Sequence, residues 1–298
     1  MPRFSCWLRP ALVAVAVLAG GAASAQPMWR PAPEGGSVSL DVLKAFAGRD
    51  VVTDERGVVI GDVGPTALNT AHVVSARFPV GFAVTVVADF PTAYFTYDAS
   101  TSNPGGGAVV GDPQSEFGIG NPYLGAELAA RPALTVEAGV RLPLSSHEFS
   151  PARFTGIQTS FEAVEMFQDG TFSARLGVRY EPAVSHAIRL RLLAAPVLRT
   201  FDSFEQDGPV VQERRATNVE VQYGAQVVGL LDRVELAGGV VGRLDTAGDI
   251  NHSPVSLTLG ASAQGLPVRP GLLIRVPIHD NLFDTDAVVG FSLDVPLR

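Results

Sequence analysis

The sequence predicts a closed antiparallel transmembrane β-barrel of about twelve strands, exported to the outer membrane of a bacterium. Three observations predict this fold class. The chain begins with a segment typical of a secretory signal. Apolar and polar residues then alternate along segments long enough to cross a bilayer as tilted strands. Short and long connections between these segments also alternate, as in bacterial outer-membrane barrels.

Residues 1–25 are expected to be a signal peptide. Arg3 and Arg9 give a positive start, residues 11–18 form a short apolar stretch, and residues 23–25 (Ala-Ser-Ala) match a cleavage site. Cleavage would leave residues 26–36 as a periplasmic N-terminal segment and 37–298 as the barrel. The only cysteine, Cys6, lies in the signal, so the mature chain is expected to contain no thiol and no disulfide.

The charge balance argues against nucleic acid as a partner. Of 22 basic residues, Arg3 and Arg9 belong to the signal, so 20 remain against 30 acidic residues. Nucleic-acid binding depends on basic residues that neutralise phosphates. No stretch of the remaining sequence has the run of about 18 apolar residues that a transmembrane helix needs, so a closed barrel is the one way left to cross lipid.

The strand prediction rests on period-two alternation. In residues 133–144, Leu134 and Val136 alternate with Glu137 and Arg141, and helical spacing fits poorly. Twelve segments are expected as strands: 37–46, 68–78, 81–90, 118–129, 133–144, 171–181, 186–200, 215–230, 233–244, 254–264, 268–278 and 286–296. Ten or fourteen strands remain as alternatives.

The connections between these segments alternate in length. Short turns are expected at 79–80, 130–132, 182–184, 231–232 and 265–267. Longer loops are expected at 47–67, 91–117, 145–170, 201–214, 245–253 and 279–285. This is the pattern of tight periplasmic turns and long external loops, with both termini in the periplasm.

A periplasmic β-sandwich would alternate in the same way. Its core would require bulky side chains, whereas the apolar face here is rich in Val, Leu and Ala. Aromatic residues such as Phe78, Phe82 and Tyr180 lie near strand ends, as in interfacial girdles. Both features favour the barrel.

If the apolar face contacts lipid, the polar face lines the lumen. The expected lumen-lining residues are Glu127, Glu137, Arg141, Arg175, Arg179, Arg189, Arg191, Glu220, Gln222, Gln226, Glu235, Arg243, Arg269, Arg275 and Asp294. These charges either line a polar path that selects solutes or pair with one another and fill the interior.

Two of the expected loops carry aromatic contact residues. Segment 91–117 contains Tyr94, Phe95 and Tyr97, and segment 145–170 contains Phe161 and Phe167. Thr159, with Glu162 three residues later, predicts a helix start. Three apolar residues of that helix would share a face: Phe161, Val164 and Phe167. The loop could fold inward as a constriction, extend outward as a capture site, or pack on the rim.

Catalytic and metal-binding motifs are weak. The five histidines are scattered at His72, His147, His186, His252 and His279. They form no HExxH or other closely spaced ligand pattern. Ser145 and Ser146 beside His147 are the nearest approach to a serine–histidine pair, and sequence adjacency is poor evidence for a triad. We therefore expect no enzyme activity, no metal and no cofactor.

Residues 117–128, with Gly118, Gly120, Asn121 and Gly125, form the segment FGIGNPYLGAEL. This segment resembles a glycine-rich strand of the family of outer-membrane proteins associated with meta-pathway phenol degradation. Two further segments resemble that family: 76–91 (ARFPVGF followed by ADFP) and 138–143 (AGVRLP). The resemblance implies a transporter for small, often hydrophobic or aromatic compounds.

The sequence is compatible with two functions. The first is an outer-membrane channel for passive uptake of small solutes. The second is a non-transporting structural or surface barrel whose lumen is plugged by side chains. Outer-membrane lipid, the barrel assembly machinery and a small solute are the expected partners, and a monomer is the expected state.

Overall fold

In a computed structural model of the chain, the described residues are 35–47, 51–53, 59–62, 69–102, 108–145, 150–207, 210–246, 253–278 and 285–297. The predicted signal, residues 1–25, and most of the predicted periplasmic segment lie outside this described part.

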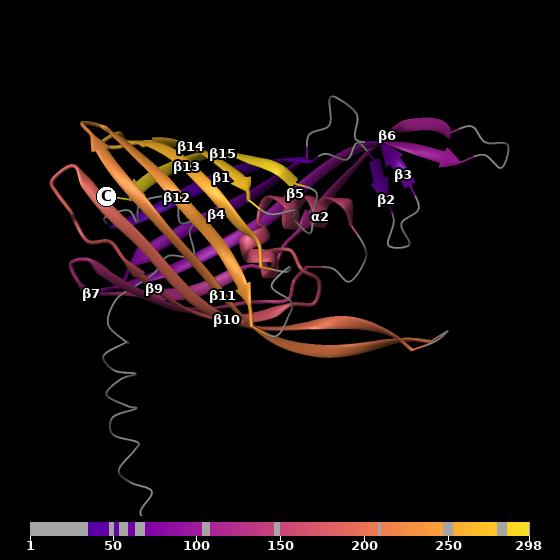
Figure 1. Cartoon of the computed structure of the whole chain (residues 1–298), viewed down its shortest axis with the longest axis horizontal. Coiled ribbons are helices and arrows are strands. Elements are labelled where there is room, and N and C mark those ends of the chain that lie inside the picture. The colour runs from indigo at the N-terminus through magenta and orange to yellow at the C-terminus, as the bar shows by residue number, and fades with distance from the viewer. Residues whose placement is uncertain are drawn as a thin grey trace, which may run out of the picture.

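The described strands form a closed antiparallel barrel of twelve wall strands (Figure 1). In chain order they are β1 (Gly36–Ala47), β4 (Thr70–Pro79), β5 (Val84–Ser102), β6 (Ala108–Ile119) with β7 (Tyr123–Arg131), β8 (Leu134–Arg141), β9 (Phe172–Tyr180), β10 (Ile188–Asp207), β11 (Val210–Leu231), β12 (Val234–Asp245), β13 (Val255–Ala263), β14 (Arg269–Pro277) and β15 (Thr285–Leu297). β6 and β7 form one wall strand, interrupted at residues 120–122. The barrel closes where β1 pairs with β15, with Gly36 opposite Leu297. The predicted fold class is confirmed.

Two segments that were expected as loops are largely strand. Strands were expected to end near residues 90 and 200, but β5 and β6 continue the pairing to Ser102 and Ala108. β10 and β11 likewise remain paired to Asp207 and Val210. Both hairpins project from the same end of the barrel (Figure 1). The loop prediction was wrong here because apolar alternation stops where lipid stops, whereas backbone pairing continues into water.

A small hairpin extends one of these projections. β2 (Val51–Thr53) and β3 (Val59–Asp62) pair with each other, and Gly61 of β3 lies opposite Ala99 of β5. Both strands lie within the predicted 47–67 loop, so that loop also contains a strand pair. The helices of the described part include none that is both long and apolar enough to cross a membrane.

The outer surface of the barrel is apolar and the inner surface is polar. On β14, Leu272, Ile274 and Val276 are exposed, whereas the alternating Leu273 and Arg275 are buried. Other strands show the same pattern, with exposed Leu257 and Leu259 beside buried Thr258 on β13. This is the reverse of a water-soluble domain and matches the apolar belt of a membrane barrel.

Residues 150–171, here called the inward segment, lie inside the loop end of the barrel (Figure 1). The segment contains helix α2 (Pro151–Thr159) and the 3-10 helix η1 (Phe161–Met166). The predicted cap, Thr159, is one residue early: Thr159 is the last residue of α2, and η1 begins at Phe161 with Ser160 as its cap. The start of α2 was not predicted: there the Ser150 Oγ accepts from the N–H of Arg153 at 3.3 Å, and Pro151 follows in the first turn. A serine cap before proline is the stronger start signal.

Candidate functional site

The residues expected to line the lumen divide into three groups by burial. Twelve of the fifteen are at most 9% exposed, and Arg175 and Arg269 are partly buried. Arg189 is exposed at the start of β10, near the short-turn end. The buried members lie on the alternating positions of their strands that face away from lipid. Asp294 lies 4.0 Å from Arg269, and the other buried members contact one another, further wall residues or the inward segment.

Near the short-turn end, Arg191 of β10 contacts Glu181, directly after β9, and Glu235 of β12. Its Nε lies 2.9 Å from the carboxylate of Glu181 and its Nη2 lies 3.1 Å from that of Glu235. Arg179 also contacts Glu181, at 3.2 Å. The Gln226 amide donates to Thr258 Oγ1 at 3.0 Å. These contacts run along the inner face of the wall from the end of β9 to β13 and involve no residue of the inward segment.

A second ion pair at this level joins Arg77 on β4 to Glu127 on β7. Both side chains are almost fully buried. Glu127 was predicted from the sequence to line the lumen, whereas Arg77 and Glu181 were not. Alternation alone would have found Arg77, because it continues the inward series of Val73 and Ser75 on the same strand.

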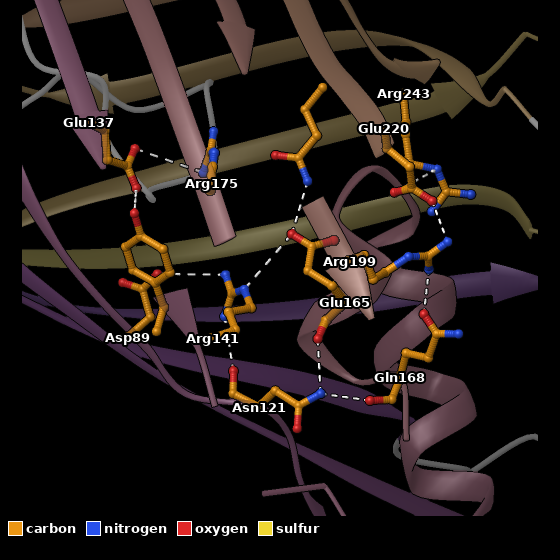
Figure 2. Close-up of polar contacts among 12 residues, drawn as sticks. Asp89, Asn121, Glu137, Arg141, Glu165, Gln168, Arg175, Arg199, Glu220 and Arg243 are labelled. Atoms are coloured by element: carbon orange, nitrogen blue, oxygen red, sulfur yellow. Dashed lines mark hydrogen bonds and ion pairs between the residues drawn. The ribbon is translucent and has the colours of Figure 1, made fainter. Parts of the chain in front are cut away.

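Arg141 lies in a buried network with Asp89, Glu137 and Arg175 (Figure 2), and the buried Tyr123 connects Arg141 to Glu137. The Tyr123 hydroxyl donates to Glu137, and Arg175 Nη1 lies 3.9 Å from the same carboxylate. Arg141 lies with its guanidinium 5.3 Å from the Tyr123 ring centre and 3.9 Å from Asp89. Neither Tyr123 nor Asp89 was identified from the sequence.

At the loop end, wall residues hold the inward segment (Figure 2). Glu165 Oε1 accepts from Gln222 Nε2 at 2.9 Å and lies 3.8 Å from Arg141 Nε. Arg199 donates both to Gln168 of the segment and to Glu220 of the wall. Arg243 lies 3.7 Å from the same Glu220 carboxylate.

Another part of the wall, on β14, binds the end of α2 and the start of η1. Arg275 of β14 pairs with Glu162 and donates to the carbonyl of Thr159 at 2.7 Å. Its guanidinium also lies 5.5 Å from the centre of the Phe161 ring. One arginine therefore contacts the end of α2 and the start of η1.

Apolar contacts complete the seat of the inward segment. Phe161 packs against the wall residues Leu43, Leu273 and Val288. Phe167 belongs to a separate buried cluster, formed by Ala71, Val73, Ala93, Phe95, Ala152, Met166 and Phe167. Phe161, Val164 and Phe167 are all buried. However, Ala163 between them has non-helical dihedrals. Phe161 and Phe167 pack against different strands of the wall.

The aromatic residues expected in the 91–117 loop lie on a strand instead. Tyr94 and Phe95 are neighbours on β5, so they face opposite sides of the wall. Phe95 is buried against the inward segment and Tyr94 is partly buried. Tyr97 is also in β5, but its side chain lies outside the described part.

The described residues give no geometry for a metal site or a serine–histidine pair. No group of three or more potential ligands occurs among them. The Ser145 hydroxyl donates to the carbonyl of Phe167 at 3.4 Å. Ser146, His147, His252 and His279 lie outside the described residues. What the site can do chemically is bind and exclude: it presents paired charges of both signs and a chain segment that occupies the interior.

No family model matches this sequence, and no curated protein matches it. Solved structures with TM-scores of 0.50 and above share its fold. An outer membrane channel from Pseudomonas putida gives a TM-score of 0.52 at 9% identity, covering 92% of this chain and 99% of that chain. LpxR from Salmonella typhimurium gives 0.50 at 12% identity, covering 88% and 100%. The toluene transporter TbuX from Ralstonia pickettii gives 0.45 at 12% identity, covering 90% of each chain.

The fold is thus that of bacterial outer-membrane barrels, and the outer-membrane location expected from the sequence is confirmed. The resemblance to the phenol-degradation family is supported at the level of outer-membrane barrels, while membership of that family stays a prediction.

Proposed function

We propose that this barrel is an outer-membrane channel for passive uptake of small solutes, and that the inward segment limits its conductance. One observation carries the proposal. A discrete stretch of chain, residues 150–171, occupies the loop end of a polar interior and is held there by ion pairs and apolar contacts. A gate requires such a separate element with a defined seat.

The class of solute follows from the resemblance, which implies small hydrophobic or aromatic compounds. The seat of the segment supports this class. Phe161 and Phe167 cover apolar wall positions that include Leu43 and Val73. Movement of the segment would uncover these positions beside the buried charges and create a path with both apolar and polar sides. We also propose that the barrel is a monomer and that it carries out no catalysis.

Deletion of residues 151–169, with a short Gly-Ser linker in their place, tests the channel. We expect a larger single-channel conductance in planar bilayers than the parent protein shows. A barrel in which the β10–β11 tip, residues 204–213, is replaced by a two-residue turn is the matched control, because that hairpin projects away from the interior. The control should conduct as the parent does. Heat-modifiability on gels verifies that every variant is folded.

A second candidate is a structural barrel with a permanently filled lumen. The contacts of Arg191 with Glu181 and Glu235 favour it, because they pair charges inside the barrel without any residue of the inward segment. On this account the folded deletion variant would stay as impermeable as the parent. That result would contradict the channel proposal.

A further inference from the structure

The wall strand formed by β6 and β7 carries one extra residue at its interruption. Ile119 lies opposite Thr92 and Tyr123 opposite Asp89, so residues 120–122 face only residues 90 and 91 on β5. This is the arrangement of a β-bulge, which frees backbone groups from the ladder. The N–H of Asn121 donates to the carbonyl of Met166 in the inward segment, at 2.6 Å.

The side chain of Asn121 is fully buried and binds the same region of the segment. Its Nδ2 donates to the carbonyls of Glu165 and Gln168, at 2.9 and 2.6 Å (Figure 2). Its Oδ1 accepts from the N–H of Ser145 at 2.8 Å, just before the segment begins. Carbonyls at the end of a helix lack helical partners and must be satisfied elsewhere. Asn121 supplies donors for them.

Two glycines that precede Asn121 on the same wall strand allow the inward segment to lie close to the strand backbone. A Cβ on Gly120 would lie 2.5 Å from the carbonyl oxygen of Met166 and 2.9 Å from Pro91 Cγ. A Cβ on Gly118 would lie 3.4 Å from the Cβ of Ala152 in α2. The first distance is too short for any side chain. The second is ordinary contact and shows that α2 rests directly on the strand.

We propose that residues 118–121 form a docking notch for the inward segment, and that Asn121 is the positioning residue that fixes its C-terminal end. The glycine-rich segment found in the sequence thus has a specific task beyond building a strand. The effect of the notch on permeation rests on the proposed channel function, whereas docking itself can be measured without it.

The first test follows the accessibility of the segment. Cys6 is the only cysteine, so Val164→Cys in a Cys6→Ser background gives a single reporter at a buried position. We expect Asn121→Ala to raise the rate of labelling by an impermeant maleimide several-fold. Asn121→Asp should do the same, because it keeps the volume but loses both donors. Asn218→Ala is the control: Asn218 donates to Asp245 across β11 and β12, and labelling should match the parent. Parental labelling of the folded Asn121 variants would overturn the proposal.

The second test leaves Asn121 intact. Gly118→Cys with Ala152→Cys should form a disulfide under mild oxidation, since the two Cβ positions lie 3.4 Å apart, close to the separation of about 3.5–4.5 Å usual in disulfides. Failure to cross-link in a folded barrel would also overturn docking at the notch. Conductance then separates the two proposals. If the disulfide forms and conductance falls on oxidation and returns on reduction, both stand. If it forms without any change in conductance, docking stands and the channel function fails.

Discussion

At the scale of single residues, Tyr123 depends on two glycines. A Cβ on Gly125 would lie 2.6 Å from the Tyr123 hydroxyl, and a Cβ on Gly139 would overlap both the ring and the hydroxyl. The ring therefore lies across β7 and β8 in a space that these glycines leave open, and from there it reaches Glu137. Glycine here serves close packing, since neither position has a positive φ.

Gly139→Ala should accordingly destabilise the barrel by about 1–3 kcal/mol, the usual cost of overpacking a core. The measurement is urea unfolding of detergent-solubilised protein, followed on gels through the loss of the heat-modifiable band. Gly229→Ala is the control, because a Cβ there would meet nothing within 4 Å. Equal midpoints for the two variants would contradict the packing argument.

Arg191 offers a second test at this scale. Arg191→Ala would leave the buried Glu235 without its counter-charge, whereas Glu181 would keep Arg179. Breaking a buried pair from one side costs about 3–5 kcal/mol. Arg189→Ala, two residues earlier on the same strand, removes an exposed arginine and should change stability by no more than about 0.5 kcal/mol. The same unfolding assay measures both. A loss as small for Arg191→Ala as for Arg189→Ala would show that the buried pairs add little.

There is a physical reason why some residues of the site could not be found from the sequence. Alternation assigns a side to each residue only while the strand is regular. The extra residue at 120–122 reverses the parity, so Gly118 and Gly120 face inward on even numbers while Tyr123 and Glu127 do so on odd numbers. No pattern within the segment announces that reversal. Tyr123 was consequently overlooked although its neighbours were singled out.

At the scale of elements, period-two alternation located all twelve wall strands, because each must present apolar residues to lipid at every second position. It failed where strands leave the lipid, at the β5–β6 and β10–β11 extensions. There the side chains no longer need to alternate, and only backbone pairing defines the strand.

The position of the inward segment could not be predicted from its local sequence, for a different reason. Its sequence allowed inward, outward and rim positions, and its position depends on distant partners. Glu162 meets Arg275, 113 residues further along the chain, and Glu165 meets Gln222, 57 residues away. Helix propensity could place a turn near residue 160, but the choice of direction is made by wall residues on other strands.

For the whole molecule, the stability of the barrel depends on an apolar exterior that surrounds a charged interior. Leu259 is 63% exposed at the middle of β13. Its burial in lipid, and not in protein, is what stabilises the fold at that position. Leu266 lies in the turn between β13 and β14, 39% exposed, at the end where the short turns leave the bilayer.

Leu259→Arg should therefore destabilise the barrel in phospholipid vesicles by about 2–4 kcal/mol, the cost of arginine near the bilayer midplane, and Leu266→Arg by about 0–1 kcal/mol. Guanidinium unfolding titrations of vesicle-inserted protein measure both. The comparison depends on depth alone, because each change places the same cation on an exposed leucine. If Leu266→Arg proved the more costly, the apolar belt would have to be shifted towards the short turns. Equal small costs would mean that the exposed leucines face water, and the membrane orientation of the barrel would then be wrong.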